Sequence, residues 1–464
     1  MSIPYAWADH RLFAGAEGQL LFGVEDVSLF HLGREAAEVL ARWRAVEPLL
    51  LDQTPGPDRE VLEEFRRARV LVPVGHGRRR PAPVPSAREP LTTLVLEVAQ
   101  DCNLACRYCY ADGGAYRGSP RLLRPELARR AARCLVEASG PHSEVTLVLF
   151  GGEPLMNVPA VRAAVEEAEQ AGRAAGKTVR FSLTTNGTLV TDEAAEFLGA
   201  HRVSVSVSLD GPPDVHDANR PTRAGAGSYA AARRGLARLL RRPRAPVAAR
   251  VTLPPSQWGR VGEVFDHLIG LGVHEVGIAP ASPVTRAFLP TEEQEDLLLQ
   301  EFGALADRFL GALDRGQVLP FSNLLDLLAR IHVGASRSAP CGAGLGYLAL
   351  DTEGRFYLCH RLVGEEPFRV GDLGSGPRPA RVRECLEAMA APREEACSRC
   401  WARALCRGGC HYENHVREAV LGLPPGGTCR FVRRWIELGI RVYARLISSG
   451  REDLLGRIAI RARC

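Results

Sequence analysis

Cysteine constrains the fold of this chain more than any other residue type. The sequence holds 13 cysteines, and ten of them fall into two spaced groups, at residues 102–109 and 341–429. The N-terminus, MSIPYAWADHRLF, lacks the basic-then-apolar pattern of a signal peptide, so we expect a cytoplasmic protein. Disulfides are rare in that reducing compartment, and closely spaced cysteines there indicate metal ligation. Both groups are therefore predicted to hold metal.

Composition places the chain among ordinary globular proteins. Its 464 residues suffice for several domains of ~100–200 residues each. Hydrophobic residues make up 46% and charged residues 24%, which excludes a mainly disordered or fibrous chain. Lys and Arg number 59 against 54 for Asp and Glu, too small an excess to indicate a nucleic-acid partner. No apolar run reaches the ~18 residues of a membrane span, so no membrane partner is expected either.

Strand and helix patterns alternate between residues 92 and 285. Six nearly continuous apolar runs are separated by stretches with helical periodicity. The expected helices are Pro125–Ser139, Pro159–Gly172, Asp192–Gly199, Tyr229–Leu240 and Val261–Gly270. The expected strands are Thr93–Val98, Glu144–Phe150, Thr178–Thr184, Val203–Leu209, Val247–Leu253 and Glu275–Ala279. This alternation indicates a parallel sheet covered by helices, either open or closed into a partial barrel. In both cases ligands bind at the carboxyl ends of the strands.

The segments on either side of this core differ in composition. Residues 1–75 combine short apolar runs with two helical stretches and are expected to form a small module. Residues 76–91 hold four prolines and a run of arginines, which is typical of a linker. Residues 286–335 are expected to form a helical bridge. Residues 336–464 are rich in Gly, Cys and Pro, with little periodicity before a helix at 431–448, so something other than a hydrophobic core must hold them.

The first cysteine group directly follows the first expected strand. Cys102, Cys106 and Cys109 have the spacing C-x3-C-x2-C. Three thiolates leave one iron of a [4Fe–4S] cluster without a protein ligand, and that iron can bind the amine and carboxylate of a small molecule. The alternative is a structural zinc site, which needs four ligands, and no fourth ligand is near in sequence.

With Tyr108 between its last two cysteines, this loop resembles that of the radical S-adenosylmethionine (radical SAM) superfamily. Further matches follow in order at the strand ends. They are FGGEP at residues 150–154, TTNGT at 184–188, SVSLDG at 206–211 and Arg250 in the fifth strand. Each motif alone is more often an ordinary turn. Their order after a three-cysteine loop carries the resemblance, which covers about residues 92–285.

The resemblance implies a partial (βα)6 TIM-type barrel that binds a catalytic [4Fe–4S] cluster through Cys102, Cys106 and Cys109. It also implies the reaction. The cluster gives one electron to S-adenosylmethionine, supplied by a donor such as flavodoxin or ferredoxin, and a 5′-deoxyadenosyl radical takes a hydrogen atom from the substrate. The residues implied to contact S-adenosylmethionine are Tyr108, Gly151, Gly152, Glu153, Asn186, Ser206, Ser208, Asp210 and Arg250.

The second group has seven cysteines in the order C-x12-G-x4-C … C-x2-C-x5-C-x3-C … C. Four of them, between residues 397 and 410, would by spacing alone also suit zinc. The whole order resembles the SPASM domain, which follows a radical SAM core and holds two auxiliary clusters, so three [4Fe–4S] clusters are implied in all. The implied ligands are Cys341, Cys359 and Cys410 for the first auxiliary cluster and Cys397, Cys400, Cys406 and Cys429 for the second.

The first auxiliary cluster has only three implied cysteine ligands. No cysteine lies between Cys341 and Cys359, where some relatives supply a fourth. An open iron there would suit a substrate thiolate. A ligand from elsewhere in the chain, or water, is the alternative.

Two further resemblances concern the substrate. The strands and helices of residues 1–75 resemble a PqqD-like recognition element, a winged-helix-like domain that binds the leader of a precursor peptide by strand addition. The alternative is a structural cap on the catalytic domain. Residues 357–364 and 368–372 resemble maturases that install thioether crosslinks, among them the maturation protein of quinohemoprotein amine dehydrogenase.

The sequence therefore predicts a radical SAM enzyme that modifies a ribosomally made precursor peptide or small protein subunit. The expected product is an intrapeptide thioether between a cysteine sulfur and a carbon atom. Alternatives are a cyclophane-forming maturase and a sulfatase maturase that makes formylglycine, which would not need the recognition element. A zinc-stabilised peptide-binding scaffold is the alternative without enzyme activity.

Overall fold

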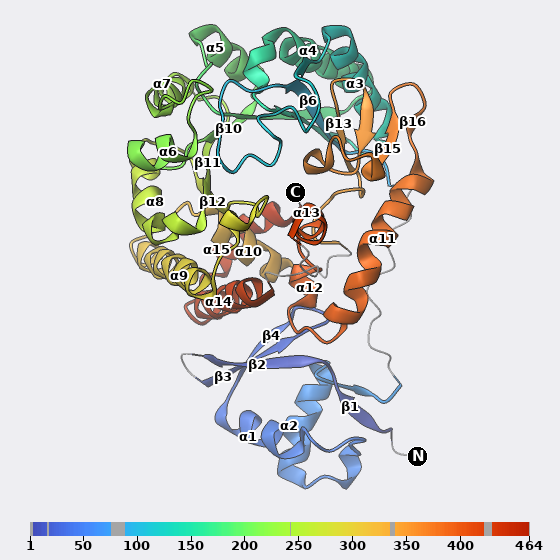
Figure 1. Cartoon of the computed structure of the whole chain (residues 1–464). Coiled ribbons are helices and arrows are strands. Elements are labelled where there is room, and N and C mark those ends of the chain that lie inside the picture. Colours follow the sequence, from blue (N-terminus) through green and yellow to red (C-terminus); the bar gives the residue numbers. More distant parts are fainter. Residues whose placement is uncertain are drawn as a thin grey trace.

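Six parallel strands form the centre of this computed structural model, which describes residues 3–15, 18–75, 89–241, 243–334, 339–421 and 429–463. The strands are β6 (Thr93–Gln100), β8 (Glu144–Gly151), β9 (Thr178–Thr185), β10 (Ser204–Ser208), β11 (Val247–Leu253) and β12 (Val276–Pro280). Each is parallel to the next along the chain. Figure 1 shows helices around their outside. The predicted partial barrel is confirmed.

The outer helices begin and end within two residues of the predicted bounds. They are α3 (Pro125–Ala138), α4 (Val158–Ala174), α5 (Asp192–Ala200), α7 (Tyr229–Leu240) and α8 (Val261–Gly270), with the short strand β7 (Arg121–Leu122) and helix α6 (Pro213–Asn219) as additions. Buried apolar side chains alternate with partly exposed ones along β8, β9 and β10, because one face of these strands packs under the helices. Leu96, Leu147 and Val207 have no exposed surface. Small side chains such as Ala131 and Ala164 let the helices pack closely on them.

The helical bridge consists of α9 (Glu292–Asp314) and α10 (Ser322–Val333). The predicted capping box at the start of α9 is present, since Thr291 and Gln294 each accept a hydrogen bond from the other's backbone N–H. At the start of α10 the Asn323 side chain donates to the Ile278 carbonyl and accepts from the Ile278 N–H. The bridge therefore covers the outer edge of β12.

The C-terminal part extends the same sheet. Strand β13 (Tyr347–Leu350) lies parallel to β6 on its other side, and β14 (Arg355–Tyr357), β15 (Arg369–Asp372) and β16 (Gly376–Pro377) follow as antiparallel strands. The remaining elements are α11 (Pro379–Ser398), α12 (Arg403–Cys406), α13 (His411–Leu421), α14 (Cys429–Ser448) and α15 (Glu452–Ile458). The expectation of little regular structure before residue 430 is wrong. Helix α11 escaped the sequence pattern because its apolar residues do not gather on one face.

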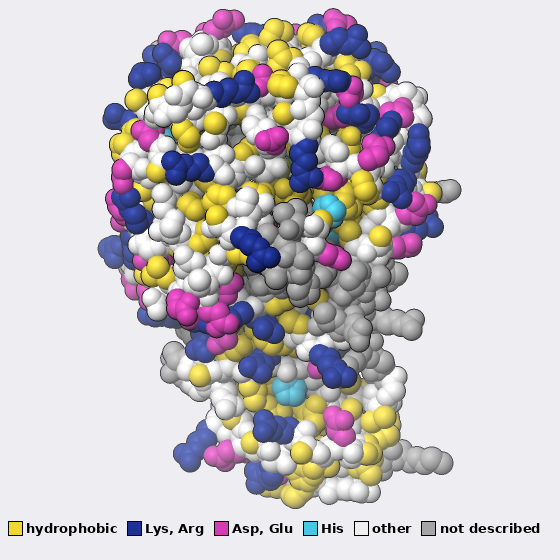
Figure 2. Space-filling model, viewed as in Figure 1, with side chains coloured by type: hydrophobic (Ala, Val, Ile, Leu, Met, Phe, Trp, Pro, Cys, Tyr) yellow, Lys and Arg dark blue, Asp and Glu magenta, His cyan; other side chains and the backbone are white. Residues whose placement is uncertain are grey.

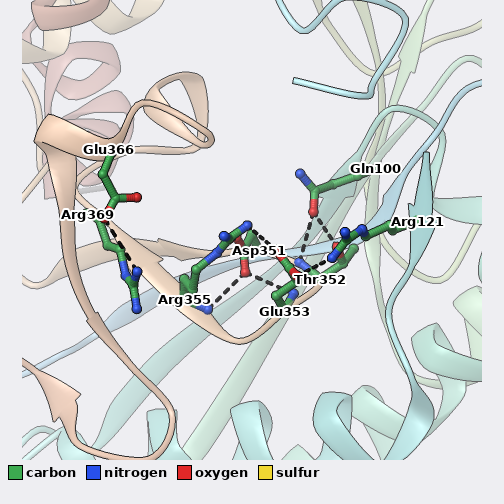
Figure 3. Close-up of polar contacts among 8 residues, drawn as sticks. All are labelled: Gln100, Arg121, Asp351, Thr352, Glu353, Arg355, Glu366 and Arg369. Carbon is green, nitrogen blue, oxygen red and sulfur yellow. Dashed lines mark hydrogen bonds and ion pairs between the residues drawn. The ribbon is translucent and has the colours of Figure 1, made fainter. Parts of the chain in front are cut away.

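Polar contacts fasten this C-terminal hairpin to the barrel (Figure 3). Gln100, the last residue of β6, accepts hydrogen bonds from the backbone N–H and the hydroxyl of Thr352. Asp351 accepts from the backbone N–H of Arg355 at 2.9 Å and from its Nε at 2.6 Å, which shapes the β13–β14 turn. The strand that leads into the first cysteine group is thus joined to the hairpin that leads into the second.

The N-terminal module forms a lobe below the barrel (Figures 1 and 2). It contains β1 (Tyr5–Trp7), β2 (His10–Gly15), β3 (Gly18–Gly23), β4 (Leu29–Leu32), α1 (Arg34–Trp43), α2 (Gly56–Arg67) and β5 (Leu71–Pro73). Strands β2, β3 and β4 form one antiparallel sheet, and β1 pairs with β5. Most of the predicted linker, residues 76–88, lies outside the described residues.

The surface carries both signs of charge. Basic and acidic side chains are interspersed over the face seen in Figure 2. Among the described helices, none combines the length and apolar character needed to cross a membrane.

Candidate functional site

The first cysteine loop is held by the barrel on which it stands. It leaves the end of β6, where the Asp101 carboxylate accepts from the Cys102 N–H at 2.9 Å. The N–H groups of Ala105 and Arg107 donate to the carbonyls of Pro221 and Asn219 at 2.8 and 3.0 Å. The loop therefore has its shape fixed by backbone hydrogen bonds to the segment that follows α6.

The three thiols of this loop lie within electrostatic reach of one another. Burial and, to a smaller extent, the charges of Glu153, Cys106 and Cys109 raise the pKa of Cys102 to about 12. Asn186 Nδ2 lies 3.7 Å from the Cys102 sulfur. A metal that binds these thiols must displace their protons, so the site favours a strongly bound thiophilic metal.

Arg220 is a site residue that the sequence analysis missed. Its guanidinium lies 3.9 Å from the Cys106 sulfur and pairs with Asp210 at 3.0 Å, and both side chains are almost fully buried. The guanidinium also lies over the Tyr108 ring, 5.3 Å from the ring centroid. A fixed positive charge beside Cys106 stabilises its thiolate form, which is the form that binds metal.

A cavity of ≈ 420 Å³ opens beside the loop at the carboxyl ends of the strands. Most of the residues predicted to contact S-adenosylmethionine line it. They are Tyr108, Gly151, Gly152, Asn186, Ser206, Ser208 and Arg250, together with Cys102, Cys106 and Cys109. The barrel thus brings together side chains that are up to about 150 residues apart in the sequence.

Two glycines let the end of β8 approach the loop. A Cβ on Gly151 would lie 2.3 Å from the Ala99 carbonyl oxygen, and Gly151 has a φ of +141°. A Cβ on Gly152 would lie 2.3 Å from the Asp101 carbonyl oxygen. Glycine is required at both positions because any side chain would push this strand end away from the cysteine loop.

Glu153 and Asp210 have no exposed surface and lie behind the cavity wall. Glu153 accepts hydrogen bonds from the Asn186 N–H at 2.7 Å and from the Thr185 hydroxyl at 2.7 Å, and burial raises its pKa to about 7. Asp210 accepts from the Tyr108 hydroxyl and from the Thr252 N–H. In this structure both carboxylates position wall residues, and their predicted contacts with S-adenosylmethionine stay predictions.

The second cysteine group separates into two sets of neighbouring thiols. Burial, followed by the charges of Cys341 and Cys410, raises the pKa of Cys359 to about 12. Cys406 has a raised pKa from burial and from neighbours of its own, which are Cys429, Cys397 and Cys400. These are the same two sets that the SPASM resemblance implies. No three His, Cys, Asp or Glu side chains in the described ranges lie close enough for a single metal ion, whereas cluster ligands each bind a different iron.

Most of the far wall of the cavity comes from residues within three positions of Cys359 or Cys410, two cysteines of the second group. His360, Arg361 and Glu413 line the cavity together with Ser282, which follows β12. Arg361 pairs with Glu413 at 2.8 Å and lies 3.7 Å from the sulfur of Cys410. The Ser282 hydroxyl donates to Glu413 at 2.5 Å. One cavity therefore touches both cysteine groups.

Two tyrosines fix the position of Arg361. Its guanidinium lies 4.8 Å from the ring centroid of Tyr110 and 4.3 Å from that of Tyr412. Tyr110 directly follows the first cysteine group. The Nδ1 atom of His360 accepts a hydrogen bond from the Tyr347 hydroxyl. Burial lowers the pKa of His360 to about 3, so the imidazole ring is neutral. Proximity to Cys359 was the only sequence signal for Arg361.

The family model of the radical SAM superfamily matches residues 96–268. Residues 96–268 form a radical SAM domain. The chain is 26% identical over 362 residues to the serine-type anaerobic sulfatase-maturating enzyme of Klebsiella aerogenes. This match covers 75% of this chain and 85% of that enzyme. The corresponding Bacteroides thetaiotaomicron enzyme is 33% identical over 152 residues, 32% of this chain and 36% of that one.

The solved structure of anSMEcpe with bound AdoMet and the Cp18Cys peptide has the same fold. Its TM-score is 0.65 at 18% identity, and the match covers 78% of this chain and 99% of that one. With the radical SAM domain and the sulfatase-maturating relatives, the chain is an iron–sulfur radical enzyme. The scaffold interpretation without enzyme activity is thereby excluded.

Proposed function

We propose that this enzyme removes a hydrogen atom from a side chain of a ribosomally made precursor peptide or small protein subunit. The observation that carries the proposal is the shared cavity. Its near wall is the first cysteine loop, and its far wall is formed by His360, Arg361 and Glu413, which follow Cys359 and Cys410. When bound, S-adenosylmethionine and the catalytic [4Fe–4S] cluster supply a 5′-deoxyadenosyl radical. The protein's own residues then bind, orient and shield the reactants.

The near wall suits S-adenosylmethionine. Cys102, Cys106 and Cys109 hold the catalytic cluster in this proposal, and Gly151 and Gly152, which line the cavity without side chains, leave room for the amino-acid part of the cofactor. Hydroxyl, amide and cationic groups on the near wall are available for the carboxylate and the ribose of S-adenosylmethionine. They belong to Ser206, Ser208, Asn186 and Arg250. Glu153 and Asp210 act from behind the wall by holding Asn186 and Tyr108.

The far wall suits thioether formation. In the proposal Cys341, Cys359 and Cys410 hold the first auxiliary [4Fe–4S] cluster, and Cys397, Cys400, Cys406 and Cys429 hold the second. Only three thiols gather in the first set, which supports an open iron that takes a substrate thiolate. Joining that sulfur to a carbon atom would transfer one hydrogen atom from the carbon to the 5′-deoxyadenosyl radical, release the proton of the thiol and pass one electron to the auxiliary cluster. Flavodoxin or ferredoxin would supply the electron for cofactor cleavage.

The N-terminal module suits leader binding. Among the described strands, β4 pairs only with β3, so its outer edge is available for strand addition. The match to anSMEcpe with bound AdoMet covers 98% of that chain but 80% of this one. The extra length in this chain is similar to that of the N-terminal module and linker, which supports a leader-dependent substrate.

Formylglycine formation is the second candidate because the curated relatives are sulfatase-maturating enzymes. In that reaction a serine or cysteine of a protein becomes an aldehyde. A cyclophane-forming maturase would instead join two carbon atoms. All three products need the same hydrogen abstraction, so the cavity alone does not separate them.

The test uses anaerobically reconstituted full-length enzyme with S-adenosylmethionine and dithionite. One substrate set is the peptides encoded by small open reading frames beside the gene, and the other is a sulfatase-derived peptide with serine or cysteine at the target position. Mass spectrometry measures hydrogen loss, iodoacetamide measures free thiol, and a hydrazine probe captures aldehyde. The Cys102→Ala/Cys106→Ala/Cys109→Ala variant is the control.

A thioether product loses two hydrogens and one alkylatable thiol and does not react with hydrazine. Aldehyde capture from the sulfatase peptide would replace the proposal with formylglycine formation. Hydrogen loss with all thiols still alkylatable would indicate a cyclophane. Absence of 5′-deoxyadenosine in every reaction would contradict hydrogen abstraction by this chain.

A further inference from the structure

The sheet of the N-terminal module is covered on both faces. One face packs on the module's own helices, where Leu21 lies in a core with Leu40 and Leu62. The opposite face, with Phe13 and Phe22, lies in a second core that the C-terminal part supplies. Figure 1 shows the sheet between α1 and α2 on one side and α12 and α14 on the other. The module is therefore docked on the C-terminal part and not joined to the enzyme by its linker alone.

The cysteine loop forms part of the other side of this docking surface, beside α10 and α14. Trp401 directly follows Cys400, and its ring meets those of Phe13 and Phe22 edge-on at centroid distances of 5.1 and 6.1 Å. Ala404 and Leu405 are buried in the same core. Some of the residues that contact the N-terminal sheet thus stand between two of the thiols assigned to the second auxiliary cluster.

An ion-pair cluster joins the same loop to the module. Arg403 Nη2 pairs with Asp9 at 2.6 Å and with Glu25, and its side chain is only 12% exposed. Its Nη1 donates to the carbonyl of Cys400 at 3.1 Å. One guanidinium therefore ties the backbone beside a thiol to two carboxylates of the N-terminal module. Such a partly buried pair is sensitive to loss of either partner.

The cysteine loop needs outside support. Helix α12 is a single turn of four residues, and an isolated turn is unstable in water. Arg407, which ends it, has a positive φ of 53°. Local propensity thus does little to set the loop's shape.

We infer that the N-terminal module is the wall that holds the loop of residues 397–406 in the shape that binds the second auxiliary [4Fe–4S] cluster. This inference rests on the proposed function for the identity of that cluster. It goes beyond leader recognition, because the module then has a second task that requires no peptide. Damage to the docking surface releases one cluster and leaves the catalytic cluster in place.

The experiment reverses the charge at the docking surface in the full-length protein. Arg403→Glu places three carboxylates together, and Arg403→Glu/Glu25→Arg restores a pair of opposite charges. Arg34→Glu is the matched control, because it breaks an exposed pair with Glu38 on the module's far side. Iron and sulfide content and EPR spectra are measured after identical reconstitution.

Wild type is expected to hold about twelve irons and Arg403→Glu about eight, since each cluster has four. The EPR signal that S-adenosylmethionine perturbs is expected in every variant. The double variant Arg403→Glu/Glu25→Arg is expected to regain the iron that Arg403→Glu loses. Unchanged iron in Arg403→Glu would overturn the inference. So would equal iron loss in the Arg34→Glu control.

A second measurement separates this inference from the proposed function. In metal-free protein, the rate of iodoacetamide labelling is measured by peptide mass spectrometry at Cys400 and Cys406. Arg403→Glu is expected to speed labelling there by about tenfold, with Cys106 unchanged as the internal reference. If wild type binds only about four irons, the auxiliary clusters of the proposed function are lost, and labelling still decides the docking claim. Equal labelling in wild type and Arg403→Glu would contradict it.

Discussion

The two cysteine groups stand on different supports. In the first group Cys102 is 8% exposed, and backbone bonds tie its loop to the barrel. In the second group Cys341 and Cys429 are exposed, and α12, the described helix that lies wholly within the loop of residues 397–406, is one turn long. The first loop takes its shape from the strand ends beneath it. The second takes its shape from a docked neighbour and from whatever its thiols bind.

This difference predicts that loss of metal has different consequences at the two sites. A site whose shape the barrel sets can lose its metal and keep its fold. A site that few buried apolar side chains support gains part of its folding free energy from metal binding. Loss of ligands should therefore abolish catalysis in the first group and disturb structure in the second.

The largest expected effect contrasts ligand loss in the two groups. Cys102→Ala/Cys106→Ala/Cys109→Ala should lower reductive cleavage of S-adenosylmethionine by more than about 10³-fold, because the cofactors carry the chemistry. Cys397→Ala/Cys400→Ala/Cys406→Ala should retain that cleavage but become sensitive to protease between residues 397 and 429. 5′-Deoxyadenosine yield and limited proteolysis measure the two effects. The comparison fails if the first variant is the one that protease cuts.

The next effect probes the buried support of the first loop. Asp210→Asn leaves the Arg220 guanidinium buried without its charge partner, which should lower the free energy of unfolding by about 3–5 kcal/mol. Asp214→Asn is the matched control, since it breaks an exposed pair with Arg260 and should leave the free energy of unfolding nearly unchanged. Urea unfolding of the metal-free proteins measures both. Equal losses would show that the buried network does not support the loop.

A pH-dependent effect of similar size comes from Glu153. Burial raises its pKa from 4.5 in the unfolded chain to about 7, so the folded state binds more protons between these values. Stability must then fall as pH rises through that window, by about 3 kcal/mol, and the loss is complete above about pH 7. Glu153→Gln removes this contribution.

Urea unfolding of wild type and Glu153→Gln between pH 5 and pH 8 isolates the effect. Glu97 is also buried with a pKa well above its usual range, but it is present in both proteins and cancels in the difference. Wild type should lose stability relative to the variant as pH rises. Parallel pH profiles would refute the assignment to Glu153.

The barrel was predictable because its signals are local. Each strand has apolar side chains at alternate or successive positions, each helix has one apolar face, and the predicted bounds of β11, α7 and α8 agree with the structure to the residue. The grouping of the thiols was implied by the SPASM resemblance, whereas spacing alone would have grouped the four cysteines between residues 397 and 410. Strand β1 was missed because three residues carry no clear period, and β2 was missed because its sequence, HRLFAG, does not alternate apolar and polar residues.

The orientation of side chains was harder to predict than their position. A motif at a strand end locates Glu153 and Asp210 near the site, but only packing decides that both lie behind the wall. Arg220 and Glu413 reach the site through contacts between distant segments, for which a single sequence has no signal. Cluster ligation and cofactor contacts therefore stay predictions, although most of the residues concerned share one cavity.

The smallest effects concern the junction between the two regions (Figure 3). Thr352 is 7% exposed, and its hydroxyl donates to Gln100 at the end of β6. Thr352→Val should lower the free energy of unfolding by about 1–2 kcal/mol, because it leaves a buried acceptor short of a donor. Arg121 pairs with Glu353 nearby, but the side chains are 51% and 38% exposed.

Arg121→Ala should therefore cost no more than about 1 kcal/mol and become neutral at high salt. Urea unfolding at low and high salt measures both variants. If Arg121→Ala lowers the free energy of unfolding more than Thr352→Val does, the surface charge pair couples the barrel to the C-terminal hairpin. That coupling would then weaken as ionic strength rises. If the order holds, the coupling runs through the buried end of β6, the strand from which the first cysteine loop departs. The two cysteine groups would then have different supports, although both are connected to the same strand, β6.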